Sequence, residues 1–186
     1  EHPEVAEDST LRAYTGDMVH QISTANIIFM PSLVIDARAL GKARFPQAHR
    51  HGGGDYLYWM DLIQHGARFV FSTLPEVRCG SGINMWYGSG WGTDGLGKRI
   101  LDEARFRKTV LDRYANNPAT REALSQRLTD LYLLLLQDIG HRLRRRKAVD
   151  WSLLRQFHSE IRPNILNAIF SGFKLIFPDE PISTKL

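Results

Sequence analysis

A single cysteine, Cys79, is present in the 186-residue sequence. One thiol cannot build an internal disulfide framework or a cysteine zinc cluster, and so few cysteines are typical of a reducing compartment. Long apolar runs are missing too, since no uninterrupted stretch approaches the roughly 18 to 20 residues that span a bilayer. The opening EHPEVAEDST is acidic and polar, unlike a secretion signal. These absences predict a cytoplasmic protein.

The sequence has little excess of positive charge outside one segment. The formal net charge is only +4, and much of the basic excess lies in HRLRRRK, residues 141–147. A nucleic-acid-binding face usually spreads Lys and Arg along a whole surface, so the pattern does not favour a nucleic-acid partner. Hydrophobic residues make up 43% and charged residues 24%, which is ordinary for a globular protein. The length suffices for one substantial domain, with or without an appendage.

Short elements alternate in the first half of the sequence. TLRAY and the run from Val19 through ISTANIIFM are typical of strands, as is ARFVFS, and a helical apolar pattern begins at Asp55 between them. Strand, helix and strand with short links predict an α/β layer. We expect the strands around Ile27 and Phe69 to lie in one sheet of this layer.

After about residue 95 the sequence becomes helical in character. Apolar side chains recur at helical spacing from Gly97 to Ala115, and Pro163 can open a last helix near the end. We therefore expect two regions, an α/β region over residues 1–95 and a helical region over residues 96–186.

Capping signals divide the helical region. Asn117 and Pro118 form an N-cap and first-turn pair for a long helix to about Arg146, and Asp150 can cap the next helix. The long helix is too rich in leucine to stand free. We expect it to pack on other helices of the chain, with a homodimer as the alternative.

Three glycines, Gly52 to Gly54, precede Asp55. Glycine lets a ligand approach the backbone closely and tolerates positive φ, and the first turn of a helix stabilises a carboxylate as the anion. Such a carboxylate can accept a proton from an attacking hydroxyl. The alternative is that Asp55 is only an N-cap after a flexible loop.

Several motifs follow one another in an order that carries a resemblance. They are the apolar run and short helix STANIIFMPSLVIDARALG, the turn FPQAHRHG, the step Gly53-Gly54-Asp55, the aromatic helix YLYWMDL, and GARF before the strand. In this order they resemble the second half of a family 2 glycosyltransferase with a GT-A fold. The later EVRCGSGINMWYGSGWGT is similar to a segment of a bacterial subset of these enzymes. The resemblance covers residues 20–95.

This resemblance implies a partial GT-A domain with a Rossmann-like mixed sheet. It also implies an inverting transfer of a sugar from a nucleotide-sugar donor to a hydroxyl of a glycan or lipid-linked acceptor. In the family the acid of the glycine-acid step is the general base, which corresponds to Asp55. The preceding residue is usually Glu in the family and is Gly54 here, so a second carboxylate is missing.

A nucleotide-binding half is also missing by this comparison. Enzymes with the GT-A fold usually hold a divalent cation, Mg or Mn, through an Asp-x-Asp motif, and none occurs here. His49, His51 and His65 do not have a metal-ligand spacing. We therefore expect the acceptor-side half of a larger enzyme, with no cofactor of its own and a cation in the complete enzyme.

Further side chains of this region can contact a sugar. Trp86 and its aromatic neighbours could stack on a sugar ring or fill an interface between the two regions, and Trp59 would support the wall of the site. Arg78 could contact a phosphate or be solvated, and Asn84 could bind a hydroxyl or only form a turn. The candidate substrate-binding residues are Gly52, Gly53, Gly54, Trp59, Arg78, Asn84 and Trp86.

The basic run has two interpretations. Cations stabilise a helix C-terminus, so a solvated helix end is the first. The second is a surface for an anionic membrane, formed with the apolar segment NAIFSGFKLIF. The cations concerned are Arg142, Arg144, Arg145, Arg146 and Lys147.

A second function stays open beside the enzyme. With Gly54 in place of Glu and no cation motif, the chain could be a non-catalytic interaction or dimerisation module derived from a glycosyltransferase.

Overall fold

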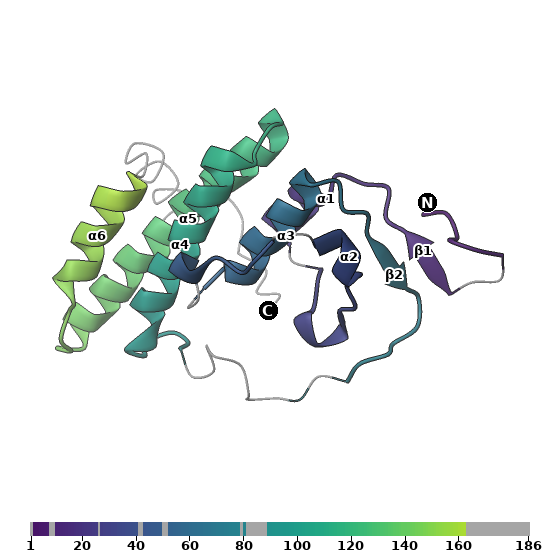
Figure 1. The fold of residues 1–186 in the computed structure, drawn as a ribbon. Coiled ribbons are helices and arrows are strands. Elements are labelled where there is room, and N and C mark those ends of the chain that lie inside the picture. Colours follow the sequence, from purple (N-terminus) through teal and green to yellow (C-terminus); the bar gives the residue numbers. More distant parts are fainter. Residues whose placement is uncertain are drawn as a thin grey trace, which may run out of the picture.

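The structure is a computed structural model that describes residues 2–7, 10–25, 27–40, 43–49, 52–78, 80 and 89–162. Within these residues the protein is mostly helical, with one small antiparallel sheet (Figure 1). The coarse expectation of a mixed α/β protein is therefore confirmed. No helix in the described residues is long and apolar enough to cross a membrane.

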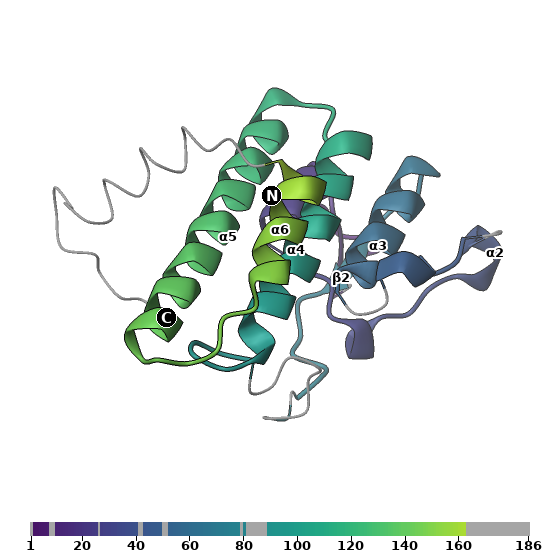
Figure 2. The same cartoon turned by 90° about the vertical axis from the view of Figure 1, so that its left-hand side faces the viewer.

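Up to residue 162, the described part of the second region contains three helices: α4 (Gly95–Arg113), α5 (Pro118–Arg144) and α6 (Trp151–Ile161). Figures 1 and 2 show them side by side, and α5 packs on α4, α6 and α1 of the same chain. The packing of the long helix within the chain is as expected from its leucine content.

Both predicted caps of this region are confirmed. The Asn117 side chain accepts a hydrogen bond from the Thr120 amide at 2.7 Å, and Asp150 accepts one from the Ser152 amide at 2.9 Å. Each cap satisfies a backbone N–H that has no partner within the helix, and this fixes where α5 and α6 begin.

The first region contains shorter elements. Its strands are β1 (Leu11–Ala13) and β2 (Val70–Ser72), which pair antiparallel with Arg12 opposite Phe71. Its helices are α1 (Met18–Thr24), η1 (Met30–Ser32), α2 (Ala37–Leu40), η2 (Gln47–His49) and α3 (Gly54–Gln64). The two strands lie at the end of the molecule away from α6, with α1 and α3 in between (Figure 1).

Two strand predictions are wrong. The run that begins at Val19 forms α1, because Asp17 caps it through the His20 amide at 2.9 Å and because Met18 and Ile22, four residues apart, are both buried. Ile27 belongs to no strand in the described residues. The strand beside ARFVFS is β1, and Phe69 lies just before β2, where its carbonyl accepts a hydrogen bond from the Tyr14 amide.

Apolar side chains form two clusters. The first joins α1, α3, the second half of α4 and the start of α5, with Trp59, Met60, Phe106 and Leu124 among its buried members. The second joins the first half of α4 to α5 and α6, around Phe157. Although secondary structure changes character near Gly95, the first cluster therefore contains residues from both sides of this position.

Candidate functional site

The candidate site is the start of α3. Gly53 is the N-cap of this helix and has φ +77°, a left-handed conformation that favours glycine. A β-carbon on Gly53 would come within 2.3 Å of the Phe106 side chain, and one on Gly54 would lie 2.9 Å from the His49 carbonyl oxygen. Packing alone therefore requires these two glycines, with or without a ligand.

Asp55 lies in the first turn of α3 and is half-buried. It is not the N-cap, and its side chain has no hydrogen bond or ion pair with the residues that the structure describes. The interpretation of Asp55 as a simple cap is therefore wrong. Its carboxylate performs no evident structural task in this part of the chain.

Aromatic and basic groups surround the start of α3. The Tyr56 ring packs against Phe106 with 4.8 Å between ring centroids. The pKa of His49 is lowered by burial and, to a smaller extent, by the positive charges of Arg113 and Arg105. His49 therefore favours its neutral form and can act there as a hydrogen-bond donor or acceptor without adding charge.

Trp59, one turn after Asp55, is only 1% exposed. Its ring lies edge-on to Phe45 at 6.2 Å, and its buried indole nitrogen has no hydrogen-bond partner among the described residues. The structure therefore places Trp59 in the core, where it supports α3 from within and offers no exposed ring face to a ligand.

Of the other candidate residues that the structure describes, Gly52 lies at the start of α3 and Arg78 does not. Gly52 is half-buried beside Gly53, and Arg78 is exposed in the segment after β2. Asn84 and Trp86 lie outside the described residues, as does the predicted helix after Pro163.

A cavity of about 620 Å³ lies elsewhere, between the two-stranded sheet and the segment from Ile27 to Leu33. Its wall is largely apolar, and many of its side chains are also exposed. Asp55 and the three glycines before it, Gly52 to Gly54, line neither this cavity nor the second, smaller one near Asp94. Neither cavity is therefore an open cleft with these glycines as its floor. Sequence analysis missed the larger cavity because it forms only when strands from distant segments pair. The exposed apolar side chains that line it are Ile27, Phe29, Val70, Phe71, Leu74 and Val77.

Arg142 is not available as a surface cation. Its guanidinium donates to Asp138 at 2.7 Å, to Asp94 at 3.0 Å and to the Thr93 carbonyl at 2.6 Å. These bonds, with that to Asp138 first, raise the pKa of Arg142 above its usual range. The first arginine of the basic run therefore has a structural role, which corrects its assignment to a membrane surface.

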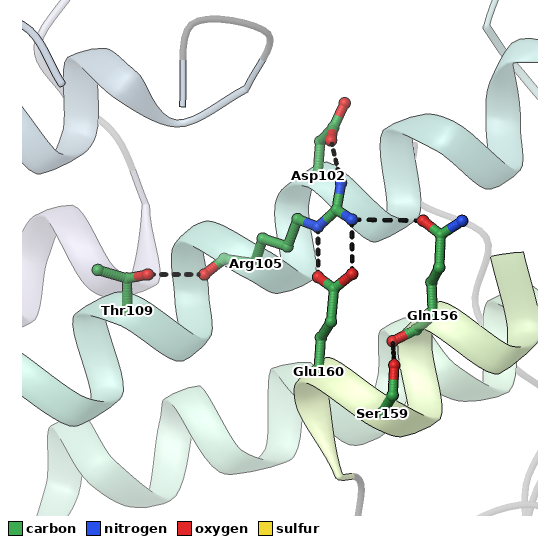
Figure 3. Close-up of polar contacts among 6 residues, drawn as sticks. All are labelled: Asp102, Arg105, Thr109, Gln156, Ser159 and Glu160. Carbon is green, nitrogen blue, oxygen red and sulfur yellow. Dashed lines mark hydrogen bonds and ion pairs between the residues drawn. The ribbon is translucent and has the colours of Figure 1, made fainter. Parts of the chain in front are cut away.

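A second ion-pair network ties α4 to α6 (Figure 3). Arg105 donates to both oxygens of Glu160, at 2.6 and 2.7 Å, and also contacts Asp102 and Gln156. The hydrogen bonds from Arg105 lower the pKa of Glu160. This network explains charged residues that sequence analysis left unassigned, and its role is structural.

No known protein family, curated protein or solved structure matches this chain. Within the described residues, no group of three or more His, Cys, Asp or Glu side chains could hold a metal ion.

Proposed function

We propose that this chain is the acceptor-side part of an inverting glycosyltransferase and that Asp55 is its general base. The observation that carries the proposal is the carboxylate itself, which is half-buried in the first turn of α3 without a partner among the described residues. Buried polar groups with a structural role are normally hydrogen-bonded, whereas a general base must keep its oxygens available to the acceptor.

The proposed reaction forms a bond between the acceptor oxygen and the anomeric carbon of the sugar. The bond from that carbon to the nucleotide diphosphate breaks, and the diphosphate leaves with the bonding electrons. The hydroxyl proton moves to a carboxylate oxygen of Asp55. Attack from the face opposite the leaving group inverts the anomeric centre.

Exposed apolar side chains around the larger cavity support the idea of a larger enzyme. Large exposed apolar patches commonly mark interaction sites. We infer that this face packs against a nucleotide-binding part, which would bind the donor. The residues of this chain do not fit a cation site in the part that the structure describes, so a Mg or Mn ion would be held by that other part.

The test is Asp55→Asn in the complete enzyme, assayed with a panel of nucleotide sugars. Asparagine keeps the size of the side chain and loses the proton acceptor, so transfer should fall by about 10² or more while the urea midpoint stays unchanged. Asp130→Asn is the matched control, because Asp130 is exposed on α5 and, within the described residues, its side chain is hydrogen-bonded only to Gln126. Transfer by Asp55→Asn at near the parental rate would show that Asp55 is not the base.

The same apolar face favours a second candidate, a non-catalytic interaction module. In that case Phe71→Ser and Leu74→Ser, both at exposed positions of the cavity wall, would weaken binding to the partner chain. Asp55→Asn would then change nothing. The enzyme proposal expects losses of activity from both kinds of variant, so the two candidates are distinguishable.

A further inference from the structure

One end of the helical bundle brings together three segments: the turn before α4, the end of α5 and the start of α6 (Figure 1). The Trp91 ring lies 5.6 Å from that of His141, and the Lys147 ammonium donates to the Gly92 carbonyl at 3.4 Å. Arg142 holds the turn before α4 in place by donating hydrogen bonds to the Thr93 carbonyl and to the Asp94 carboxylate. We call the exposed residues of this end, Trp91, Leu143, Arg144, Arg145, Arg146, Lys147 and Trp151, the basic end.

The turn that carries the cations has a defined shape. The Lys147 amide donates to the Arg142 carbonyl at 2.9 Å, and the Arg146 amide donates to that of Leu143 at 3.1 Å. This is the Schellman pattern of a helix C-terminus, in which the left-handed position is usually glycine. Here Arg146 holds it, with φ +53°. A cation therefore stands where the backbone would favour glycine.

Positive charge at the basic end is not neutralised by neighbouring acids. Arg144, Arg145, Arg146 and Lys147 are all exposed, and none forms an ion pair within the described residues. The acids of this end have other partners. Asp94 and the buried Asp138 both form ion pairs with Arg142, and Asp150 caps α6. Arg105 and Arg107, by contrast, are each paired with an acid.

Apolar surface accompanies this charge. Trp91 is 52% exposed, Leu143 55% and Trp151 50%. In residues 89–162 the only other exposed large apolar side chain is Leu136, at 38%, which lies two turns before Leu143 on the same side of α5. Tryptophan is enriched where membranes meet water, because its ring is apolar and its N–H is polar.

We propose that the basic end docks onto an anionic lipid surface, with Trp91, Leu143 and Trp151 entering the headgroup layer. Four unpaired cations give the charge complementarity, and the exposed apolar groups distinguish lipid from a purely phosphate-bearing partner such as RNA. The proposal does not depend on the assignment of Asp55. In this proposal Trp91, Leu143 and Trp151 form the apolar part of the surface, the part that the sequence analysis assigned to NAIFSGFKLIF.

Binding to vesicles tests the proposal with the full chain. Vesicles of phosphatidylcholine with phosphatidylglycerol should bind the protein at about 0.1 M salt, and vesicles of phosphatidylcholine alone should not. Arg144→Gln with Arg145→Gln and Lys147→Gln should weaken binding on the order of 100-fold. Arg44→Gln with Arg68→Gln and Arg113→Gln removes equal charge at exposed positions elsewhere and should change binding little.

Arg146→Gly separates docking from folding. Glycine relieves the left-handed strain, so this variant should raise the urea midpoint and at the same time weaken vesicle binding about fivefold. Brominated lipid should quench the tryptophan fluorescence of the parent, and Trp91→Ala with Trp151→Ala should abolish this quenching.

Three results would overturn the proposal. The first is absence of binding to the anionic vesicles. The second is equal weakening by the control triple variant, which would assign binding to net charge alone. The third is binding of the parent chain to single-stranded RNA, lost in the basic-end variants, when vesicles are not bound.

Discussion

The backbone of Gly53 lies against Phe106, so close that a β-carbon at Gly53 would come 2.3 Å from Cγ of the ring. This contact joins the start of α3 to the middle of α4. It gives the glycine step a structural cause, whereas Asp55, two residues later, makes no comparable contact. The two parts of the glycine-acid motif thus have separate explanations.

Gly53→Ala should destabilise the protein by about 2 to 5 kcal/mol, because it combines left-handed strain with overpacking against Phe106. Gly66 also has positive φ, +82°, but a β-carbon there would have no heavy atom within 4 Å. Gly66→Ala should therefore cost only about 1 to 2 kcal/mol. Urea unfolding compares the two, and equal losses would show that the Phe106 contact adds nothing.

Tyr114 should make stability fall at high pH. Burial first, and then its hydrogen bond to Asp61, raise the pKa of Tyr114 from 10.0 to about 12. The folded state holds this proton more tightly, so the contribution to stability is complete below pH 10 and is lost as pH rises towards 12. Tyr114→Phe should cost about 1 to 3 kcal/mol at pH 7 and reduce the decline of the urea midpoint between pH 10 and 12. An unchanged decline would contradict this assignment.

Arg142→Gln should be strongly destabilising, by about 3 to 5 kcal/mol, because it leaves the Asp138 carboxylate buried without its cation. Asp138 is only 3% exposed, and one of its oxygens already lacks a hydrogen-bond partner in the part of the chain that the structure describes. Arg144→Gln, two residues along the same helix but exposed, should change stability by less than about 0.5 kcal/mol. Thermal unfolding of both variants checks the contrast, and similar losses would refute it.

Glu160 should contribute to stability at neutral pH and lose that contribution in acid. Arg105 lowers the pKa of Glu160 below 4.5 in the folded state, so the contribution is present above pH 4.5 and disappears as pH falls through the lowered value. Arg105→Gln should cost about 1 kcal/mol or less at low salt, since both partners are partly exposed, and should remove this pH dependence. A cost that is unchanged in 1 M salt would argue against an ionic origin.

Local signals predicted the helical region well. Asn117 and Asp150 fix helix starts through contacts with residues two or three positions away, and Pro118 occupies the first helical position after Asn117. Such signals can be read from sequence. Asp17 gives the same kind of signal before α1, and this cap favours a helix over the strand predicted after Val19.

The strands in TLRAY and ARFVFS were predicted from the sequence, but their pairing with each other could not be predicted in the same way. β1 and β2 pair across about sixty residues of chain, with Leu11 opposite Ser72, and each strand has only three residues. So short a strand carries little periodic pattern. The candidate site was located at Asp55 by motif, but the burial of Trp59 depends on packing against Phe45, which lies in another segment.

The first apolar cluster has a consequence for cleavage of the chain. Because α3 and α4 contribute to the same buried surface, a cut between Arg78 and Ser89 should leave two pieces that remain associated and separate only in denaturant. For the same reason, grafting the helices from Gly95 onwards onto another protein would expose Phe106 and Val110 unless α1 and α3 were carried with them. The two regions therefore share one buried apolar surface, although their secondary structure differs.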